Sequence, residues 1–410
     1  MRLREAEAED VNRKTDIAVV GGGPCGSFSA LTAAKLGADV VVFEEHKEIG
    51  VPSHCAGHIS LNGLKQLGMS LPQKIFENEI KGAIFYSPSG RDFRVRFASP
   101  VTCVLNRALF DKHLTELAEK AGVKYHLGAR VDSLVWENGF VRGVSVKGDT
   151  MQSNMVIDSE GCSSVLLKKS GFATLDKCMV VNGVEGEIDR ISNVDQDTVE
   201  VYVGKKYAPG LFAWIIPRRD GSAKMGLATK TGNPRKYLEY FVNHNPKAIE
   251  KLKQSKFVNV SYHPITLGGP LAKTYYNGLL IVGDSASQVK PTTGGGIVMG
   301  LNCAKIAGET AYQAMKHENY SEDFLSLYQQ KWHKAIGFDM TVMRLVRLML
   351  NRLSDDELDR LISLCSELHM DETLQKVKDI DFQGKALLPA FKSPNIWTVA
   401  LYFLLASITK

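Results

Sequence analysis

The sequence predicts a mixed α/β fold, α+β overall, in which a parallel sheet is interrupted by an antiparallel sheet and followed by a lobe of helices. Three observations lead to this prediction. A strand, a glycine-rich turn, a helix and a second strand follow one another between Asp16 and Glu44. Short alternating segments between residues 183 and 228 indicate antiparallel strands, and apolar residues recur at helical spacing over about the last 80 residues. A chain of 410 residues usually exceeds one hydrophobic core, so several domains are expected.

The first element is a glycine turn between two apolar strands, which reads Gly21-Gly22-Gly23-Pro24-Cys25-Gly26. In such a turn Gly21 permits the tight bend, Gly23 lets the backbone approach a pyrophosphate, and Gly26 lets the helix pack closely on the strand. The phosphates would lie at the helix N-terminus, where unpaired N–H groups favour an anion. Glu44 ends the second strand, and its carboxylate can accept the hydroxyls of an adenosine ribose. Together these residues predict a Rossmann-like domain that binds a dinucleotide.

The composition is that of a globular protein, with 44% hydrophobic residues, 23% charged residues and a net charge of +5. No basic stripe with interleaved aromatic residues is present, so nucleic acid is not an expected partner. The seven cysteines are scattered without a Cys-x-x-Cys pair. This pattern argues against a disulfide framework and against a zinc or iron–sulfur site, and it favours the reducing cytoplasm. Residues 1–14 are charged and lack the apolar core of a signal peptide, so we expect a frayed extension.

A loop from Gly50 to Ile59 follows Glu44 and leaves the carboxyl edge of the predicted sheet, where ligands bind in open α/β folds. It carries His54, Cys55 and His58. Such a loop can be a reaction site, in which a histidine that changes charge near neutral pH recharges the thiol. The alternative, favoured by spacing alone, is a small buried thiol between two surface histidines.

Arg107 lies in the first turn of a predicted amphipathic helix, where a positive side chain opposes the helix dipole. A residue placed at such a cost often meets an anion, although a solvated arginine is an equal alternative. Further along, Gly161 follows a strand and begins another turn at which backbone amides can meet phosphate. Gly283-Asp284 ends a buried strand, and Gly294-Gly295-Gly296 begins a long helix from Ile297 to about residue 315. The N–H groups of this helix can hold an anion or an electron-rich ring edge, and Asp284 can bind polyol hydroxyls.

The predicted antiparallel sheet contains an apolar strand in which Phe212, Trp214 and Ile216 alternate onto one face. We call these three side chains the pocket wall. Ordinary sheet core is the alternative, and alternation alone favours it. The apolar tail from Ile396 to Ile408 is too short to span a bilayer. We expect it to pack as a core helix, with an interfacial anchor as the second interpretation.

Taken together, these segments resemble the flavoproteins of the p-hydroxybenzoate hydroxylase superfamily up to about residue 320. The resemblance rests on Gly21-x-Gly23-x-x-Gly26, Glu44, Arg107, Glu160-Gly161 and Gly283-Asp284. Two further motifs resemble the geranylgeranyl reductase family, in particular its archaeal digeranylgeranylglycerophospholipid reductase branch. These motifs are Gly50-x-Pro52-x-x-Cys55-Ala56 and Pro209-x-x-Phe212-x-Trp214-x-Ile216-Pro217.

The resemblance implies that the cofactor is FAD and that the chain has a Rossmann-like FAD-binding domain, an inserted antiparallel substrate domain and a C-terminal helical lobe. It implies a catalytic role for Cys55 and substrate contacts for His54, Phe212, Trp214 and Ile216. The implied cofactor-binding positions are Gly21, Gly23, Pro24, Cys25, Gly26, Glu44, Cys55, Ala56, Arg107, Val131, Asp284, Gly295, Gly296 and Ile297. The expected domain boundaries are 15–75, 98–175 and 271–325 for the FAD domain, 76–97 and 176–270 for the substrate domain, and 326–410 for the lobe.

The resemblance further implies that reduced flavin transfers hydride to carbon–carbon double bonds of geranylgeranyl chains in isoprenoid ether lipids, together with protonation. The expected partners are a prenylated lipid, a reduced electron donor such as ferredoxin or NAD(P)H, and a membrane surface contacted peripherally from the cytoplasm. Three departures from the family pattern are Phe212 and Ile216 in place of Tyr and Phe, Glu160 in place of Asp, and His54 in place of Arg. Phe-x-Trp-x-Ile-Pro also resembles a motif of flavin-dependent halogenases. A monooxygenase or halogenase and a non-catalytic electron-shuttling flavoprotein are therefore the alternatives.

Overall fold

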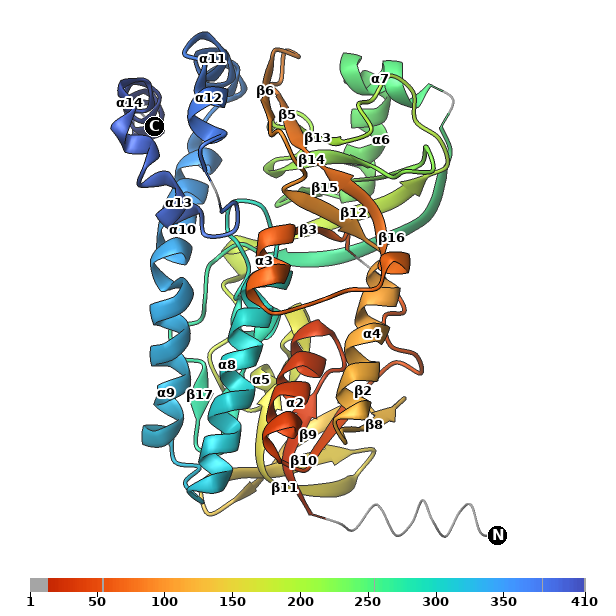
Figure 1. The fold of residues 1–410 in the computed structure, drawn as a ribbon, viewed down its shortest axis with the longest axis vertical. Helices are drawn as coiled ribbons and strands as arrows, with labels where there is room; N and C mark the ends of the chain where they lie inside the picture. Colours follow the sequence, from red (N-terminus) through yellow and green to blue (C-terminus); the bar gives the residue numbers. More distant parts are fainter. Residues whose placement is uncertain (1–13, 54, 254, 378, 409–410) are drawn as a thin grey trace.

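A computed structural model describes residues 14–53, 55–253, 255–377 and 379–408. Figure 1 shows two regions, one above the other: a lower region built on one large sheet and an upper region built on a second sheet. A column of C-terminal helices runs along one side of both regions. The fold is thus the mixed α/β architecture that the sequence predicts.

The lower sheet has eight strands, and its main path runs β17-β18-β11-β1-β2-β8. The pairs of β1 with β2 and β11, of β2 with β8, and of β11 with β18 are all parallel. Strands β9 and β10 extend β11 as an antiparallel meander. The strands are β1 (Thr15–Val20), β2 (Val40–Glu44), β8 (Lys124–Leu127), β9 (Val131–Glu137), β10 (Phe140–Val146), β11 (Asp149–Asp158), β17 (Tyr275–Tyr276) and β18 (Leu279–Ile281).

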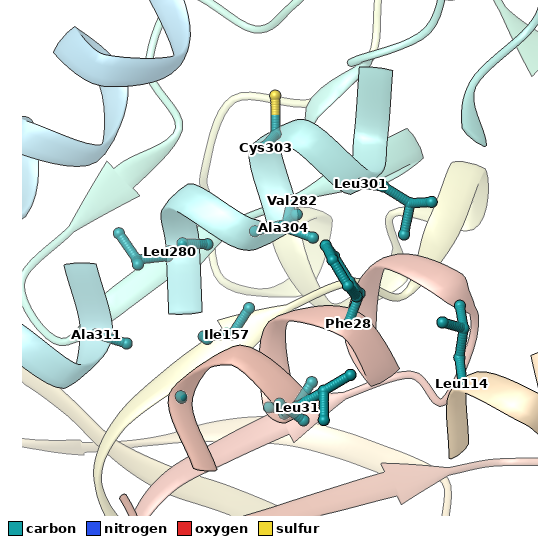
Figure 2. Close-up of a cluster of buried hydrophobic side chains, with 14 of the residues drawn as sticks. Phe28, Leu31, Leu114, Ile157, Leu280, Val282, Leu301, Cys303, Ala304 and Ala311 are labelled. Carbon is teal, nitrogen blue, oxygen red and sulfur yellow. The ribbon is translucent and has the colours of Figure 1, made fainter. Parts of the chain in front are cut away.

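Helices α2 and α8 pack closely on each other beside this sheet, because small residues line their contact. A Cβ added at Gly308 of α8 would lie 2.5 Å from the Ser29 carbonyl oxygen of α2. Figure 2 shows the resulting core, in which Phe28 of α2 points toward Ala304 of α8, and Leu31 of α2 belongs to the same cluster. This packing fixes the N-termini of both helices relative to the sheet. The helices of the lower region are α2 (Pro24–Leu36), α3 (Leu61–Gln66), α4 (Arg107–Lys120), α5 (Val165–Lys169) and α8 (Ile297–Lys316).

The upper sheet has seven strands in the order β16-β12-β15-β14-β13-β5-β6. All its pairs are antiparallel except β5 with β13, which run parallel because a long crossover separates them in sequence. The sequence predicted an entirely antiparallel sheet, and this parallel pair is the exception. Its strands are β5 (Gly82–Tyr86), β6 (Asp92–Arg96), β12 (Val180–Ile188), β13 (Thr198–Tyr202), β14 (Gly210–Pro217), β15 (Ala223–Thr229) and β16 (Phe257–Thr266).

Two helices, α6 (Pro234–His244) and α7 (Pro246–Leu252), pack on the upper sheet and were not expected from the sequence. A small third sheet joins the two regions in the order β3-β7-β4, with β3 (His58–Ser60), β4 (Phe76–Ile80) and β7 (Thr102–Leu105). Residues 76–80 therefore pair with β7 and not with the upper sheet. The exact domain boundaries stay a prediction.

The C-terminal lobe is helical, as predicted, and it forms hydrogen bonds and an ion pair with the loop that precedes α8. Arg347 of α10 donates from Nε to the Pro291 carbonyl, 2.9 Å away, and from Nη2 to the Thr292 carbonyl. Lys290 forms an ion pair with the buried Asp381, with 2.7 Å between Nζ and Oδ1. The helices are α9 (Glu322–Trp332), α10 (Phe338–Arg352), α11 (Asp355–Glu367), α12 (Met370–Leu374), α13 (Gln383–Leu387) and α14 (Pro394–Ile408).

Candidate active site

The glycine turn between β1 and α2 has the geometry that its three glycines predict. Gly21 has a φ of +94°, which side chains of L residues rarely adopt. A Cβ added at Gly26 would lie 1.9 Å from the Gly21 carbonyl oxygen, so only glycine lets α2 approach β1 this closely. A Cβ added at Gly23 would meet nothing within 4 Å. The turn thus bends at its first glycine, packs at its third and leaves open space at its second.

The N-terminus of α2 is available to an anion. Gly23 is the N-cap, Pro24 follows it, and the first turn has neither a side-chain cap nor an acidic residue. Cys25 of this turn points inward, because Cβ atoms added at Gly283 and Gly300 would come within 2.8 and 2.5 Å of its sulfur. Burial raises the pKa of the Cys25 thiol. Cys25 is therefore a neutral thiol that packs behind the turn, against Gly283 and Gly300.

A cleft of about 420 Å³ opens in front of this turn. Glu44 lies in its wall and accepts a hydrogen bond from the Gly22 N–H at 2.7 Å, while its other carboxylate oxygen lies 2.6 Å from Nδ1 of His46. Val131, at the start of β9, lies in the same wall. Of the predicted cofactor-binding positions, those that line this cleft are Gly21, Gly23, Glu44 and Val131.

The second glycine run brings Asp284 to the start of α8. Gly296 is the N-cap of α8 and provides no side-chain hydrogen bond, so the first amides of this helix are also uncapped. A Cβ added at Gly296 would lie 3.0 Å from Oδ1 of Asp284. Burial raises the pKa of the Asp284 carboxyl, whose Oδ2 accepts from the Cys162 thiol at 3.5 Å. Asp284 and the Gly295–Ile297 amides thus form one polar edge.

Of the two interpretations of Arg107, an anion contact and a solvated side chain, the structure shows an anion contact. Within the chain this anion is the carboxylate of Asp111. The two side chains form a bidentate pair with N–O distances of 3.1 to 3.2 Å, and both are nearly buried. The guanidinium of Arg107 also lies close enough to Cys55 for the two side chains to interact. The Cys55 sulfur accepts a hydrogen bond from the Gly57 N–H at 3.5 Å, so a backbone donor and a guanidinium both lie near the thiol.

The predictions for the two histidines of this loop stand differently. His54 lies outside the described residues, so its predicted substrate contact stays a prediction. His58 lies on β3, with Nε2 2.6 Å from the hydroxyl of Thr102. Burial, assisted by the charge of Lys290, lowers the pKa of His58 to about 4. A partly buried His58 with so low a pKa is neutral at neutral pH, which speaks against the suggestion that it recharges Cys55.

The turn at Gly161 is also not the open anion site that the sequence suggested. The Glu160 carboxylate accepts hydrogen bonds from the N–H groups of Leu166 and Leu167 at 2.9 to 3.2 Å. These are amides at the start of α5 that an external phosphate would need. The Glu160 carboxylate therefore takes up hydrogen-bond donors at the start of α5 that would otherwise be open to a ligand.

The pocket wall lies where the two regions meet. Trp214 and Phe212 are partly exposed, with their rings edge to face at a centroid distance of 6.1 Å, whereas Ile216 is buried. Ala56, next to Cys55, packs in the same cluster as Trp214 and Ile216. The cysteine loop and the wall, far apart in sequence, are thus adjacent in the fold.

Sequence reasoning missed two ionisable side chains on this same face of the sheet. Glu185 of β12 accepts a hydrogen bond from Nε1 of Trp214 at 3.1 Å. Lys224 of β15 donates to the Leu105 carbonyl at 3.1 Å and lies 2.7 Å from the Glu77 carboxylate. Both residues are buried. The signal available in the sequence was a charged residue within an otherwise mostly apolar strand: Glu185, followed by Glu187, in β12 and Lys224 in β15.

The chain matches the FAD binding domain family over residues 14–331 and belongs to that family. The structural observations agree with this cofactor, because both helix N-termini are uncapped and a side chain at Gly23 would enter open space. The fold and the site thus define an FAD-dependent oxidoreductase.

Within this class the chain groups with the digeranylgeranylglycerophospholipid reductases. It is 33% identical over 392 residues to the protein of that name from Methanocaldococcus jannaschii, and the match covers 93% of this chain and 99% of the relative. Its fold is similar to the crystal structure of a geranylgeranyl bacteriochlorophyll reductase-like protein from Thermoplasma acidophilum. That similarity has a TM-score of 0.85 and 25% identity, and it covers 95% of this chain and 99% of the other.

A halogenase in complex with FAD is a more distant structural relative. It has a TM-score of 0.71 at 12% identity, over 97% of this chain and 93% of the halogenase. An identity this low indicates a shared fold and carries no argument for halogenation.

Proposed function

We propose that this protein is an FAD-dependent reductase that saturates carbon–carbon double bonds of geranylgeranyl chains in isoprenoid glycerophospholipids. The observation that carries the proposal is the packing of Ala56, the neighbour of Cys55, in the same apolar cluster as Trp214 and Ile216 of the pocket wall. An apolar, partly accessible wall beside a flavin suits an isoprenoid chain. The relatives that match nearly the whole chain carry the corresponding name.

In this proposal each part of the chain has a separate task. Glu44 binds the ribose, the Gly21–Gly26 turn binds the pyrophosphate, and Asp284 with the Gly295–Ile297 amides holds the ribityl chain and the ring edge. When bound, FAD supplies hydride once a reduced carrier such as ferredoxin, or NAD(P)H, has reduced it. Phe212 and Trp214 exclude water and orient the prenyl chain. Cys55 lies near Arg107, in the loop whose Ala56 packs in the same cluster as the wall.

The test uses FAD-loaded protein reduced with dithionite and mixed without oxygen with vesicles of geranylgeranylated glycerophospholipid. We expect flavin reoxidation together with lipid mass gains in multiples of two hydrogens. Cys55→Ala should retain FAD and slow this reaction, because the loop that carries Cys55 packs in the same cluster as the pocket wall. Cys178→Ala, a change at an exposed cysteine, is the control.

Reduced flavin that persists in the presence of lipid, with no gain in mass, would exclude the proposed reaction. Wild-type rates in Cys55→Ala would remove the cysteine from the mechanism and leave the rest of the proposal standing. Oxygen consumption coupled to product formation would instead favour a monooxygenase or halogenase.

We further propose that α14 contacts the membrane surface from which the lipid is taken. Its outward side chains recur at helical spacing and form one apolar stripe, which is Trp397, Leu401, Leu404, Leu405 and Ile408, each between 45% and 62% exposed. Its opposite face packs on α10 and α11, and Tyr402 donates a hydrogen bond to the Glu357 carbonyl. No helix in the described part of the chain combines the length and apolarity needed to cross a bilayer. The stripe suits peripheral insertion at the lipid interface.

Leu401→Glu should weaken flotation with phospholipid vesicles by roughly tenfold or more, because burying one leucine contributes about 1.5–3 kcal/mol. Leu327→Glu, at an exposed leucine of α9, is the matched control and should float like wild type. Carbonate washing should release the wild-type protein from membranes. Equal flotation of both variants would exclude α14 as the contact.

A further inference from the structure

Three strands of the upper sheet place Trp214, Gly226 and Glu185 in one row. Trp214 of β14 lies opposite Gly226 of β15, and Gly226 lies opposite Glu185 of β12. Directly opposite residues in antiparallel pairs present their side chains on the same face. The row therefore runs across the face of the sheet that meets the cysteine loop.

The missing side chain at Gly226 lets the indole cross β15. A Cβ added at Gly226 would lie 2.5 Å from Cζ2 and 2.8 Å from Cε2 of Trp214. The indole thus lies over the glycine and brings Nε1 to within 3.1 Å of Oε2 of Glu185. The indole N–H can serve Oε2 whether or not the carboxyl is protonated, which leaves Oε1 as the place for a proton.

The cations near Glu185 are engaged elsewhere. Lys224 is paired with Glu77 and bonded to the Leu105 carbonyl, and Arg107 is paired with Asp111. Glu185 forms no salt bridge with any residue in the described ranges. Burial raises the pKa of Glu185 to about 7, although Lys224, the Trp214 N–H and Arg107 each act to lower it. The carboxyl thus holds a proton at neutral pH in a substantial fraction of molecules.

We propose that Glu185 is the residue that supplies the proton for saturation of the double bond, with Trp214 positioning its carboxyl at the pocket wall. This inference rests on the proposed reductase function. Three observations carry it: the row of residues across the sheet, the burial of the carboxyl without a counter-ion of its own, and the contact of this face with the Cys55–Ala56 loop. The hydrogen bond from Trp214 fixes the orientation of this carboxyl at the wall, and the proton is therefore assigned to Glu185.

The step balances as follows. Saturation of one double bond adds two electrons and two hydrogens, one as hydride from the reduced flavin and one as a proton. The hydride brings its own electron pair and forms the C–H bond at one alkene carbon. The π pair of the double bond forms the C–H bond at the other carbon with the proton from Glu185, whose O–H bond breaks. Glu185 is left as a carboxylate and regains its proton from water before the next turnover.

Several groups face Glu185 and shape its titration. Lys224 approaches it from β15, Arg107 from α4 and the indole N–H from β14, while Glu187 lies two positions along its own strand. His263 of β16 lies opposite Gly183, on the same face and two positions from Glu185. The indole donates to the carboxylate and lowers its pKa, so removing that N–H should raise the pKa further.

The first test is the pH dependence of single-turnover lipid reduction by the dithionite-reduced holoenzyme. The protonated carboxyl is the active form, so the rate should be highest below pH 7 and fall as the pH rises through about 7. Glu185→Gln keeps the oxygen that accepts from Trp214 but holds no transferable proton, and it should lower the rate by about 10²-fold or more and abolish this fall. Trp214→Phe should move the fall to higher pH. Glu187→Gln should keep the maximal rate near that of wild type and move the fall to lower pH, because it removes a like charge that raises the pKa of Glu185.

The second test needs no substrate. Because the Trp214 N–H is bonded to Glu185, the tryptophan fluorescence should titrate with a midpoint matching that of the rate profile. This transition should be absent in Glu185→Gln and in Trp214→Phe, and it should persist in Glu187→Gln. All variants should bind FAD in equal amounts, which separates a role in proton supply from a role in folding.

The outcomes separate this inference from the proposed function. Active wild-type enzyme with an undiminished Glu185→Gln rate would overturn the role of Glu185 and leave the reductase function intact. A Glu185→Gln protein that is slow but retains the wild-type pH profile would also overturn it. Wild-type enzyme that reduces no prenyl lipid would overturn the function and this role together.

Discussion

Replacing Gly26 with alanine is expected to yield a protein that neither holds FAD nor reaches native stability. The new methyl carbon would lie 1.9 Å from the Gly21 carbonyl oxygen and 2.5 Å from the Ser159 hydroxyl. Backbone atoms cannot yield as a flexible side chain can, so α2 must move away from β1. We expect the free energy of unfolding to fall by about 3 kcal/mol or more, the upper end of the cost of overpacking. Urea unfolding of the FAD-free protein measures this change.

Gly23→Ala is the matched control, because its methyl group would meet no atom of the chain within 4 Å. We expect a change in stability of about 1 kcal/mol or less, as for a change at a helix N-cap. Its FAD affinity should nevertheless fall roughly tenfold or more, since the methyl group would occupy the space over the turn. Isothermal titration with FAD checks this. Equal effects of the two substitutions on both quantities would contradict the separate tasks assigned to the two glycines.

Lys251→Met should be among the most destabilising single changes in the upper region. Lys251 and Glu200 form a buried ion pair, and the tyrosine hydroxyls of Tyr86 and Tyr202 lie beside it. Removing the lysine leaves the Glu200 carboxylate buried without a counter-ion, at a cost of about 3–5 kcal/mol. Thermal and urea unfolding of the holoenzyme measure the loss.

The double variant Lys251→Met/Glu200→Gln should recover much of this loss, because it removes both charges while the new amide still accepts from the Tyr202 hydroxyl. Lys253→Met, at an exposed lysine two residues away, should change stability by less than about 0.5 kcal/mol. A Lys251→Met protein as stable as Lys253→Met would show that the pair contributes nothing.

The parts that sequence reasoning predicted well are those determined by neighbours in the chain. The unit β1-α2-β2 needs only a glycine turn between apolar strands, and the alternation of Phe212 and Trp214 needs only one strand. The helices α6 and α7 were missed although each begins with an Asn-Pro pair, at Asn233 and Asn245, whose side chains cap the helix. That signal was present in the sequence and was not used.

Glu185 could not be predicted in the same way, because its role depends on strand pairing. Alternation alone places it on the polar face of β12, and nothing in one strand shows that this face is covered. Only the register across β14, β15 and β12 brings the indole of Trp214 to its carboxyl. The ion pair of Arg107 with Asp111 was within reach of the sequence, since the residues are four apart on one helix.

The polar contacts between the C-terminal lobe and the loop before α8 limit how this protein can be engineered. Arg347, Asp381 and Gln383 hold the carbonyls and side chains of residues 290–292, just ahead of the amides assigned to the flavin. The lobe is therefore not an exchangeable module. A chimaera that takes its last 80 or so residues from a relative would need to keep these three contacts. Without them, a change intended for the lipid-facing end would also weaken FAD binding.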